Sequence, residues 1–179
     1  MSRFRARCVP SRVQVSMRLL LLILPLAACA PAIPAAAPAP VFDPLTFFAG
    51  ATEGTARLKI VMRAARAVRV EGRGRVEPDG TLILDQVVAQ EGKPATRRQW
   101  RIRRTGPSTY AGTLSDAVGP VAGAVTGNRL HLRFTMKGGL ATDQWLTLGP
   151  DGRSAENLLT ARKFGVTVAR LDETIRKLD

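Results

Sequence analysis

The stretch AVRVEGRGRVE, residues 67–77, alternates strictly between small or apolar residues and charged ones. Val68, Val70 and Val76 fall on one face with two glycines, and arginines and glutamates fall on the other. Side chains of a β-strand point to opposite faces with a period of two, so this pattern predicts a strand with one buried face. PDG at 78–80 predicts a turn, because proline presets φ and glycine permits a positive φ.

Segments of the same kind flank this stretch on both sides. They are ARLKIVM (56–62), TLILDQVVAQ (81–90), TRRQWRIRR (96–104), TYAGTLSD (109–116), VGPVAGAVTGN (118–128), RLHLRFTMK (129–137), ATDQWLTLG (141–149) and SAENLLTARKF (154–164). A meander with one apolar face buries that face most economically by closing into a barrel, which also removes exposed edges. We therefore expect an all-β, antiparallel, up-and-down barrel of about eight strands, with a two-sheet sandwich as the alternative.

The C-terminal tail changes its period. After Gly165, apolar residues fall at helical spacing at Val168, Leu171, Ile175 and Leu178. This spacing predicts a C-terminal amphipathic helix that packs on the barrel or covers one end.

The N-terminal region, residues 1–28, is typical of an export signal. Arg18 precedes the apolar run 19–26, which is shorter than the roughly 20 residues that span a bilayer but suits a signal peptide. The run ends in LAAC at 26–29, which resembles the bacterial lipobox, in which the cysteine is lipidated. We expect Cys29 to carry the lipid, and Met17 is an alternative start to Met1.

The stretch 29–45 predicts a lipidated cysteine followed by a proline- and alanine-rich tether, before a single barrel domain at 46–179. Ala30 stands where Gram-negative lipoproteins retained at the inner membrane tend to have aspartate. We therefore expect a protein anchored by lipid to the periplasmic face of the outer membrane, with the membrane as its partner.

The charge balance is strongly basic. The chain carries a net +13, and without residues 1–28 it retains 22 bases against 14 acids, a net +8. One outer surface of the barrel is expected to carry Arg69, Arg73, Arg75, Arg101, Arg103, Arg129 and Arg133. Such a surface attracts anionic lipid. Nucleic acid is not expected as a partner, since the single tyrosine gives no stacking platform.

Catalytic residues are scarce. The chain has one histidine, His131, and two cysteines, both within the first 29 residues, so a nucleophilic triad or a closed zinc site is not expected. We expect neither enzymatic activity nor a metal or cofactor. Catalysis through a carboxylate pair drawn from Asp116, Asp143 and Glu156 is the least favoured hypothesis.

Several short motifs occur in a fixed order along the chain. They are FFAG (47–50), RQW (98–100), YAG (110–112), DAVGPVAG (116–123), GN (127–128), DQW (143–145) and ENLLTARKFGV (156–166). Their order and spacing resemble a family of proteobacterial lipoproteins of unknown function. The family pattern GNAL reads Gly127-Asn128-Arg129-Leu130 here. The resemblance implies a lipocalin-like barrel and a place in the cell envelope, but no activity. The motifs contain five polar positions of unknown role, which are Asp116, Asn128, Asp143, Asn157 and Lys163.

The leading functional hypothesis is a binding module that takes a lipid or other small hydrophobic molecule into the barrel. Gly72 and Gly74 are small at interior positions, and Trp100, Tyr110 and Trp145 are the candidate lining residues. The competing interpretation of the glycines is that neighbouring side chains fill the space at normal density. The alternative function is a cell-envelope scaffold whose basic outer face contacts anionic lipid, peptidoglycan or a partner protein.

Overall fold

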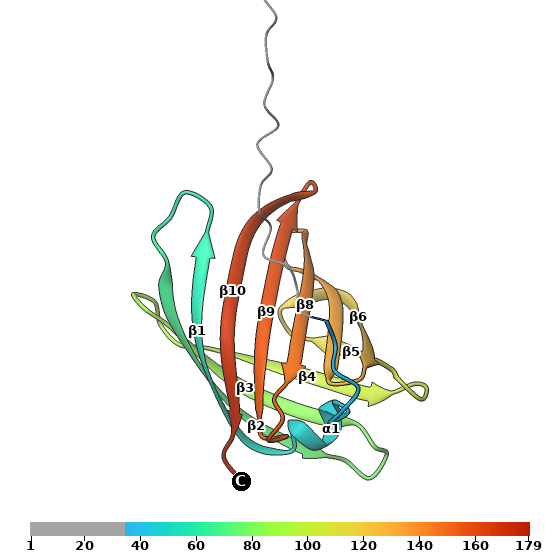
Figure 1. Ribbon diagram of the computed structural model, residues 1–179. Helices are drawn as coiled ribbons and strands as arrows, with labels where there is room; N and C mark the ends of the chain where they lie inside the picture. Colours follow the sequence, from blue (N-terminus) through green and yellow to red (C-terminus); the bar gives the residue numbers. More distant parts are fainter. Residues whose placement is uncertain (1–34) are drawn as a thin grey trace, which may run out of the picture. The chain divides into compact units, whose positions relative to one another are not determined.

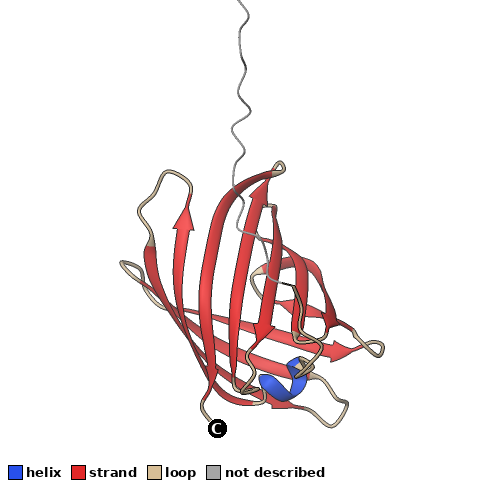
Figure 2. Cartoon of the chain, viewed as in Figure 1, coloured by secondary structure: helices blue, strands red, loops and turns tan. Residues whose placement is uncertain are grey.

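The computed structural model describes residues 35–179, which form a closed barrel (Figure 1). A short helix, α1 (Pro44–Phe47), precedes the strands. The strands are β1 (Gly50–Ile60), β2 (Arg66–Val76), β3 (Leu82–Gln90), β4 (Thr96–Arg104), β5 (Thr109–Leu114), β6 (Ala117–Thr126), β7 (Arg129–Met136), β8 (Leu140–Leu148), β9 (Ser154–Lys163) and β10 (Val166–Lys177). Figure 2 shows that strands make up almost the whole domain.

Each strand pairs antiparallel with its neighbours in sequence, and β10 closes the barrel against β1. The closing ladder runs from Thr52 opposite Lys177 to Ile60 opposite Ala169. The prediction of an all-β antiparallel up-and-down barrel is confirmed. The predicted number of about eight strands is wrong, because the barrel has ten.

The predicted C-terminal helix is also wrong, because residues 166–177 form the tenth strand. A register shift between Thr167 and Ala169 interrupts the alternation and moves Val168 out of phase with the residues that follow. Beyond this bulge, Leu171 and Ile175 are on the same side of the strand as Glu173, and polar residues occupy the other side, which are Arg170, Asp172, Thr174 and Arg176. The helical spacing was therefore accidental, and pairing with the edges of β1 and β9 determines the structure.

The two ends of the barrel are built differently. The closed end, as we call it, carries α1 and the turns at 77–81, 105–108, 127–128 and 149–153. The mouth is the opposite end, with the turns at 61–65, 91–95, 115–116, 137–139 and 164–165. No helix within 35–179 has the length and apolar character needed to cross a membrane.

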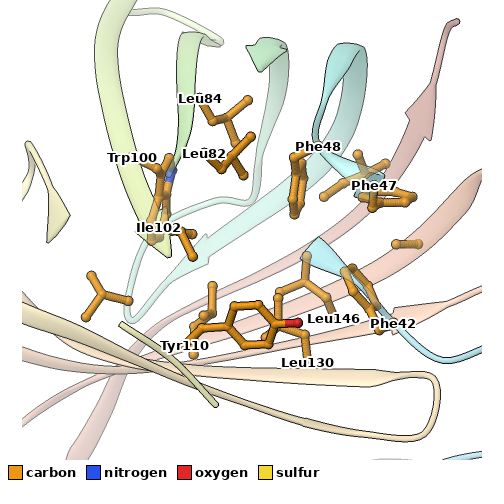
Figure 3. Close-up of a cluster of buried hydrophobic side chains, with 14 of the residues drawn as sticks. Phe42, Phe47, Phe48, Leu82, Leu84, Trp100, Ile102, Tyr110, Leu130 and Leu146 are labelled. Carbon is orange, nitrogen blue, oxygen red and sulfur yellow. The ribbon is translucent and has the colours of Figure 1, made fainter. Parts of the chain in front are cut away.

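Aromatic side chains of the N-terminal segment plug the closed end. Phe42, Phe47 and Phe48 are buried and pack on one another, with ring centroids 5.3 Å and 4.9 Å apart for successive pairs. They lie against inward side chains of the barrel such as Leu82 and Leu130 (Figure 3). Asp43 holds the segment in place, since it caps α1 and forms a 3.1 Å ion pair with Arg104.

The small residues of β2 do not leave space at this end. A Cβ at Gly74 would collide with the backbone carbonyl of Phe48, and a Cβ at Gly72 would meet Thr52 and Leu84. Glycine is therefore required at Gly74 for the close approach of the plug. The interpretation that neighbouring groups fill this space is supported over that of an open cavity beside the glycines.

Candidate functional site

Burial of the inward side chains changes along the barrel axis. At the closed end, Leu82 and Leu130 have no exposed surface and Leu146 has 1%. Towards the mouth, Leu58 and Leu171 are only half-buried, although they lie on the inward side of their strands. Solvent therefore reaches the upper lumen through the mouth, while the lower lumen is packed solid.

A ring of polar side chains separates these two regions. This polar belt consists of Gln86, Arg98, Gln144, Asn157 and Glu173, each from a different strand. The belt surrounds a void of about 20 Å³ whose other lining residues include Leu84 and Trp100. A void of this size holds a group the size of one water molecule.

One side of the belt is organised around Gln86. Its Oε1 accepts a 2.8 Å hydrogen bond from Arg98 Nε and a 2.9 Å hydrogen bond from Trp100 Nε1. Trp100 is 4% exposed and packs edge-on against Phe134. The indole is thus fixed by an apolar neighbour and by a polar contact that belongs to the belt.

The opposite side of the belt contains a buried acid. Asn157 Nδ2 donates a 2.6 Å hydrogen bond to Glu173 Oε2. Burial raises the pKa of Glu173, and the Asn157 hydrogen bond and the charge of Arg98 oppose that rise. Burial likewise lowers the pKa of Arg98, against the attraction of Glu173 and Asp116. Two groups of opposite charge therefore share one poorly solvated lumen.

Two acceptors of the belt lack a partner. Gln144 Oε1 and Asn157 Oδ1 are buried and receive no hydrogen bond within the described barrel. An unsatisfied buried carbonyl costs about 1–3 kcal/mol. Both atoms border the lumen at the level of the void. The belt therefore offers hydrogen-bond acceptors to a group that enters the lumen from the mouth.

A pocket of about 320 Å³ lies at the mouth, between the β1–β2 and β3–β4 hairpins. Leu58 and Ile60 supply apolar surface. Three cationic side chains, those of Arg63, Arg66 and Lys93, and one acid, Glu91, stand around it. An apolar surface bordered by cations suits an amphiphile with a negative group.

The three candidate lining residues are not brought together. Trp100 points into the lumen beside the belt, and Tyr110 is buried at the closed end with its hydroxyl 3.5 Å from Asp43. Trp145 lies on the outer wall, where its ring stacks on His131 with centroids 3.6 Å apart. Trp145 therefore does not line the lumen.

The motif positions Asp116, Asn128 and Lys163 lie outside the belt, although the charge of Asp116 acts on Arg98. Asn128 links the segment before α1 to the end of β8 at the closed end of the barrel. Its Oδ1 accepts a hydrogen bond from Ala37 N, and its Nδ2 donates one to Leu148 O. Lys163 Nζ donates to the carbonyl of Gly138 at the mouth, and the Asp116 carbonyl accepts from Lys137 N at 2.9 Å. These three residues connect segments that are distant in sequence.

Asp143 and Asn157, the other two motif positions, lie on opposite sides of the wall. Asp143 is on the outer face and accepts from His131 at 2.9 Å and from Arg162 at 2.7 Å. Asn157 alone of the five belongs to the polar belt. Cys29 lies outside the described residues, and in the described part no three His, Cys, Asp or Glu residues are grouped to hold a metal.

Sequence reasoning missed the other four members of the belt. Gln86, Gln144 and Glu173 each stand at an inward position among apolar residues, as in the row Leu82, Leu84, Gln86, Val88 of β3. A polar residue at such a position is the signal that identifies a belt of this kind.

The family model described as "Protein of unknown function (DUF3833)" matches residues 23–177. The chain belongs to this family. No curated protein matches its sequence.

Solved structures share the barrel of this DUF3833 protein. The S-type phycobiliprotein lyase CPES from Guillardia theta superposes with a TM-score of 0.57 at 6% identity, covering 75% of this chain and 90% of the lyase. Rv2717c from M. tuberculosis gives 0.59 at 16% identity, covering 75% and 95%. A protein of unknown function from the DUF3598 family of Nostoc punctiforme gives 0.52 at 10% identity, covering 78% of this chain and 50% of that one. At these identities the likeness establishes the fold alone.

Proposed function

We propose that this DUF3833 protein binds a small, mainly apolar molecule, such as a lipid, in the upper lumen. The observation that carries the proposal is the polar belt, whose two unpartnered acceptors, Gln144 Oε1 and Asn157 Oδ1, lie below an apolar space that solvent reaches. The lyase among the structural neighbours suggests that barrels of this shape serve small-molecule chemistry.

The polar belt and the cations at the mouth indicate which chemical groups the ligand carries. Unpartnered carbonyl oxygens at the belt require an N–H or O–H donor, and the cations around the mouth favour a negative group there. Gln86 in the belt and Gln90 at the mouth are four residues apart on β3, which is about 13 Å along a strand. The void beside the belt admits one small group, so the apolar body of the ligand stays above it. An acyl chain with a carboxylate at one end and a hydroxyl at the other has these properties.

Tryptophan emission tests the proposal, because Trp100 donates to Gln86 in the belt. In a Trp145→Phe background, 12-hydroxydodecanoate is expected to change the emission saturably and to bind more tightly than dodecanoate. Gln144→Met, which removes one acceptor and keeps the volume, is expected to abolish that preference, while the outer-wall control Thr147→Val keeps it. Absence of a saturable change with both fatty acids contradicts the proposal.

The proposal includes the location of the protein in the cell. The signal-like region, the LAAC sequence and Ala30 support a lipid anchor on Cys29 at the periplasmic face of the outer membrane. A tethered lumen would take up its ligand next to the membrane surface.

A role as an envelope scaffold is a second candidate, favoured by the arginines on the outer face. On the outer face of β4, Arg101 and Arg103 are exposed and have no ion-pair partner in the described structure, whereas Arg69 and Arg75 are paired with acids. Sedimentation with phosphatidylglycerol vesicles that is lost in an Arg101→Ala, Arg103→Ala double variant would support this role. Equal sedimentation of the double variant would exclude it.

A further inference from the structure

A groove on the outside of the barrel is separate from the lumen. It has a volume of about 640 Å³ and lies across β1, β2, β3 and β4. Most of its side chains come from outward positions of these strands, and the inward residues Thr52, Gly72, Gln86 and Arg98 also border it. Binding pockets for small molecules typically have volumes of about 300–1,000 Å³.

The acids in this groove already have arginine partners on the barrel, although each of these arginines is shared by two acids. Glu53 forms a 3.1 Å ion pair with Arg69, which also lies 3.6 Å from Glu71. Asp85 accepts from Arg75 at 3.2 Å and from Gln99 at 2.7 Å. The carboxylates are therefore occupied by partners within the barrel itself.

Two guanidinium groups of the groove are not occupied in this way. Arg73 of β2 and Arg97 of β4 form no ion pair within residues 35–179, and both are exposed. They stand two strands apart, which is roughly 10 Å across a sheet. Guanidinium groups bind carboxylate and phosphate through parallel hydrogen bonds.

Apolar side chains lie next to both arginines, since Ala51 is opposite Arg73 and Val87 is opposite Arg97 in the strand registers, while Asp85 is the other residue of β3 between the two. Ala51 and Val87 lie on the floor, and Leu178 stands at one side with 59% of its surface exposed. The exposed leucine and the half-buried valine both gain from contact with an apolar body. The groove thus combines an apolar floor with two unpaired cations.

We infer that this groove binds a small organic anion, whose apolar body lies on Ala51, Val87 and Leu178 and whose carboxylate or phosphate contacts Arg73 and Arg97. The side chains that make these contacts point to the opposite face of the strands from the side chains of the lumen, although Gln86 and Arg98 border both spaces.

Naphthalene-2-carboxylate serves as the probe, with the neutral naphthalen-2-ylmethanol as its matched control. On the purified full-length chain, amide chemical shifts are expected to move at Val87, Arg97 and Leu178 with the carboxylate and to move much less with the alcohol. Arg73→Ala and Arg97→Ala are each expected to weaken the affinity at least tenfold. Arg57→Ala, which changes an exposed arginine of β1 outside the groove, is expected to leave the affinity unchanged.

Three results would overturn the inference. The first is a set of shifts confined to mouth residues such as Leu58 and Ile60. The second is a wild-type affinity in both the Arg73→Ala and the Arg97→Ala variant, and the third is no binding at millimolar probe. Binding of fatty acids in the lumen is measured separately, by the emission of Trp100. A negative result for the groove therefore does not contradict the proposed lumen site, and the reverse is also true.

Discussion

Asn157 and Glu173 face each other on adjacent strands inside the barrel, and the amide donates a 2.6 Å hydrogen bond to the carboxylate. Glu173 is 6% exposed, and no ion pair reaches it within the described chain, so this bond and the more distant charge of Arg98 are its main compensation. An ionised carboxylate in such surroundings is destabilising unless it is paired.

Glu173→Gln is expected to stabilise the protein at neutral pH. Burial raises the pKa of Glu173 above its ordinary value of 4.5, so the folded state holds a proton that the unfolded state has already released. Stability therefore falls as pH rises from about 4.5 through the raised pKa. Glutamine carries no charge, so the variant removes this loss and gains on the order of 1 kcal/mol at pH 7, measured by urea unfolding across the pH range.

The matched control is Glu156→Gln on the outer face, where the carboxylate is exposed and accepts from Thr174. This variant keeps the wild-type pH dependence. A Glu173→Gln protein whose stability still falls between pH 4 and pH 7 would show that another group causes the slope.

Gly74→Ala is expected to destabilise the barrel by on the order of 3 kcal/mol, because the new methyl group collides with the backbone carbonyl of Phe48. Gly54→Ala meets only the end of the Glu173 side chain, which can move, so we expect a loss of about 1 kcal/mol. Chemical denaturation of the two variants measures the difference. Equal losses would mean that the plug yields as easily as a side chain.

Phe42→Ala is expected to cost about 3–5 kcal/mol, because it leaves a cavity where the side chain is 1% exposed. Asp43→Ala removes the cap of α1 and the ion pair with Arg104, and is expected to cost about 1 kcal/mol. Thermal unfolding of both proteins tests whether the aromatic packing or the polar contacts hold the plug. A smaller loss of stability in Phe42→Ala than in Asp43→Ala would show that the polar contacts contribute more than the aromatic packing.

Cys29→Ser is expected to leave an uncleaved precursor that no longer incorporates labelled palmitate, because the serine cannot form the thioether to diacylglycerol. The wild-type chain is expected to take up the label and to partition into detergent. Soluble, unlabelled wild-type protein would contradict the lipid anchor.

The barrel was predictable because alternation in β2 and its neighbours reports directly on a sheet with one buried face. The tenth strand was not, because a one-residue bulge at Val168 imitates a helical period and only the free edges of β1 and β9 reveal the alternative. The outward position of Trp145 could have been predicted from the alternation of β8, since its neighbours Gln144 and Leu146 are inward residues of that strand.

The polar belt was the least predictable part. Gln86, Arg98 and Glu173 are ordinary polar residues in their own strands, and they acquire a common role only through the registers of five different strands. Asn157 was singled out by a motif, without any indication that it faces Glu173.

The seam between β1 and β10 has a consequence for the order of assembly. The first strand of the barrel receives its second partner only from the last, so a chain still being synthesised has two unpaired sheet edges until residue 177 is available. The closing contacts are also the most distant in sequence, which makes ring closure slow. The sheet of a nascent chain of this kind therefore stays open until synthesis is complete. Loss of even the final dozen residues would leave an open sheet that is prone to aggregate, rather than a smaller barrel.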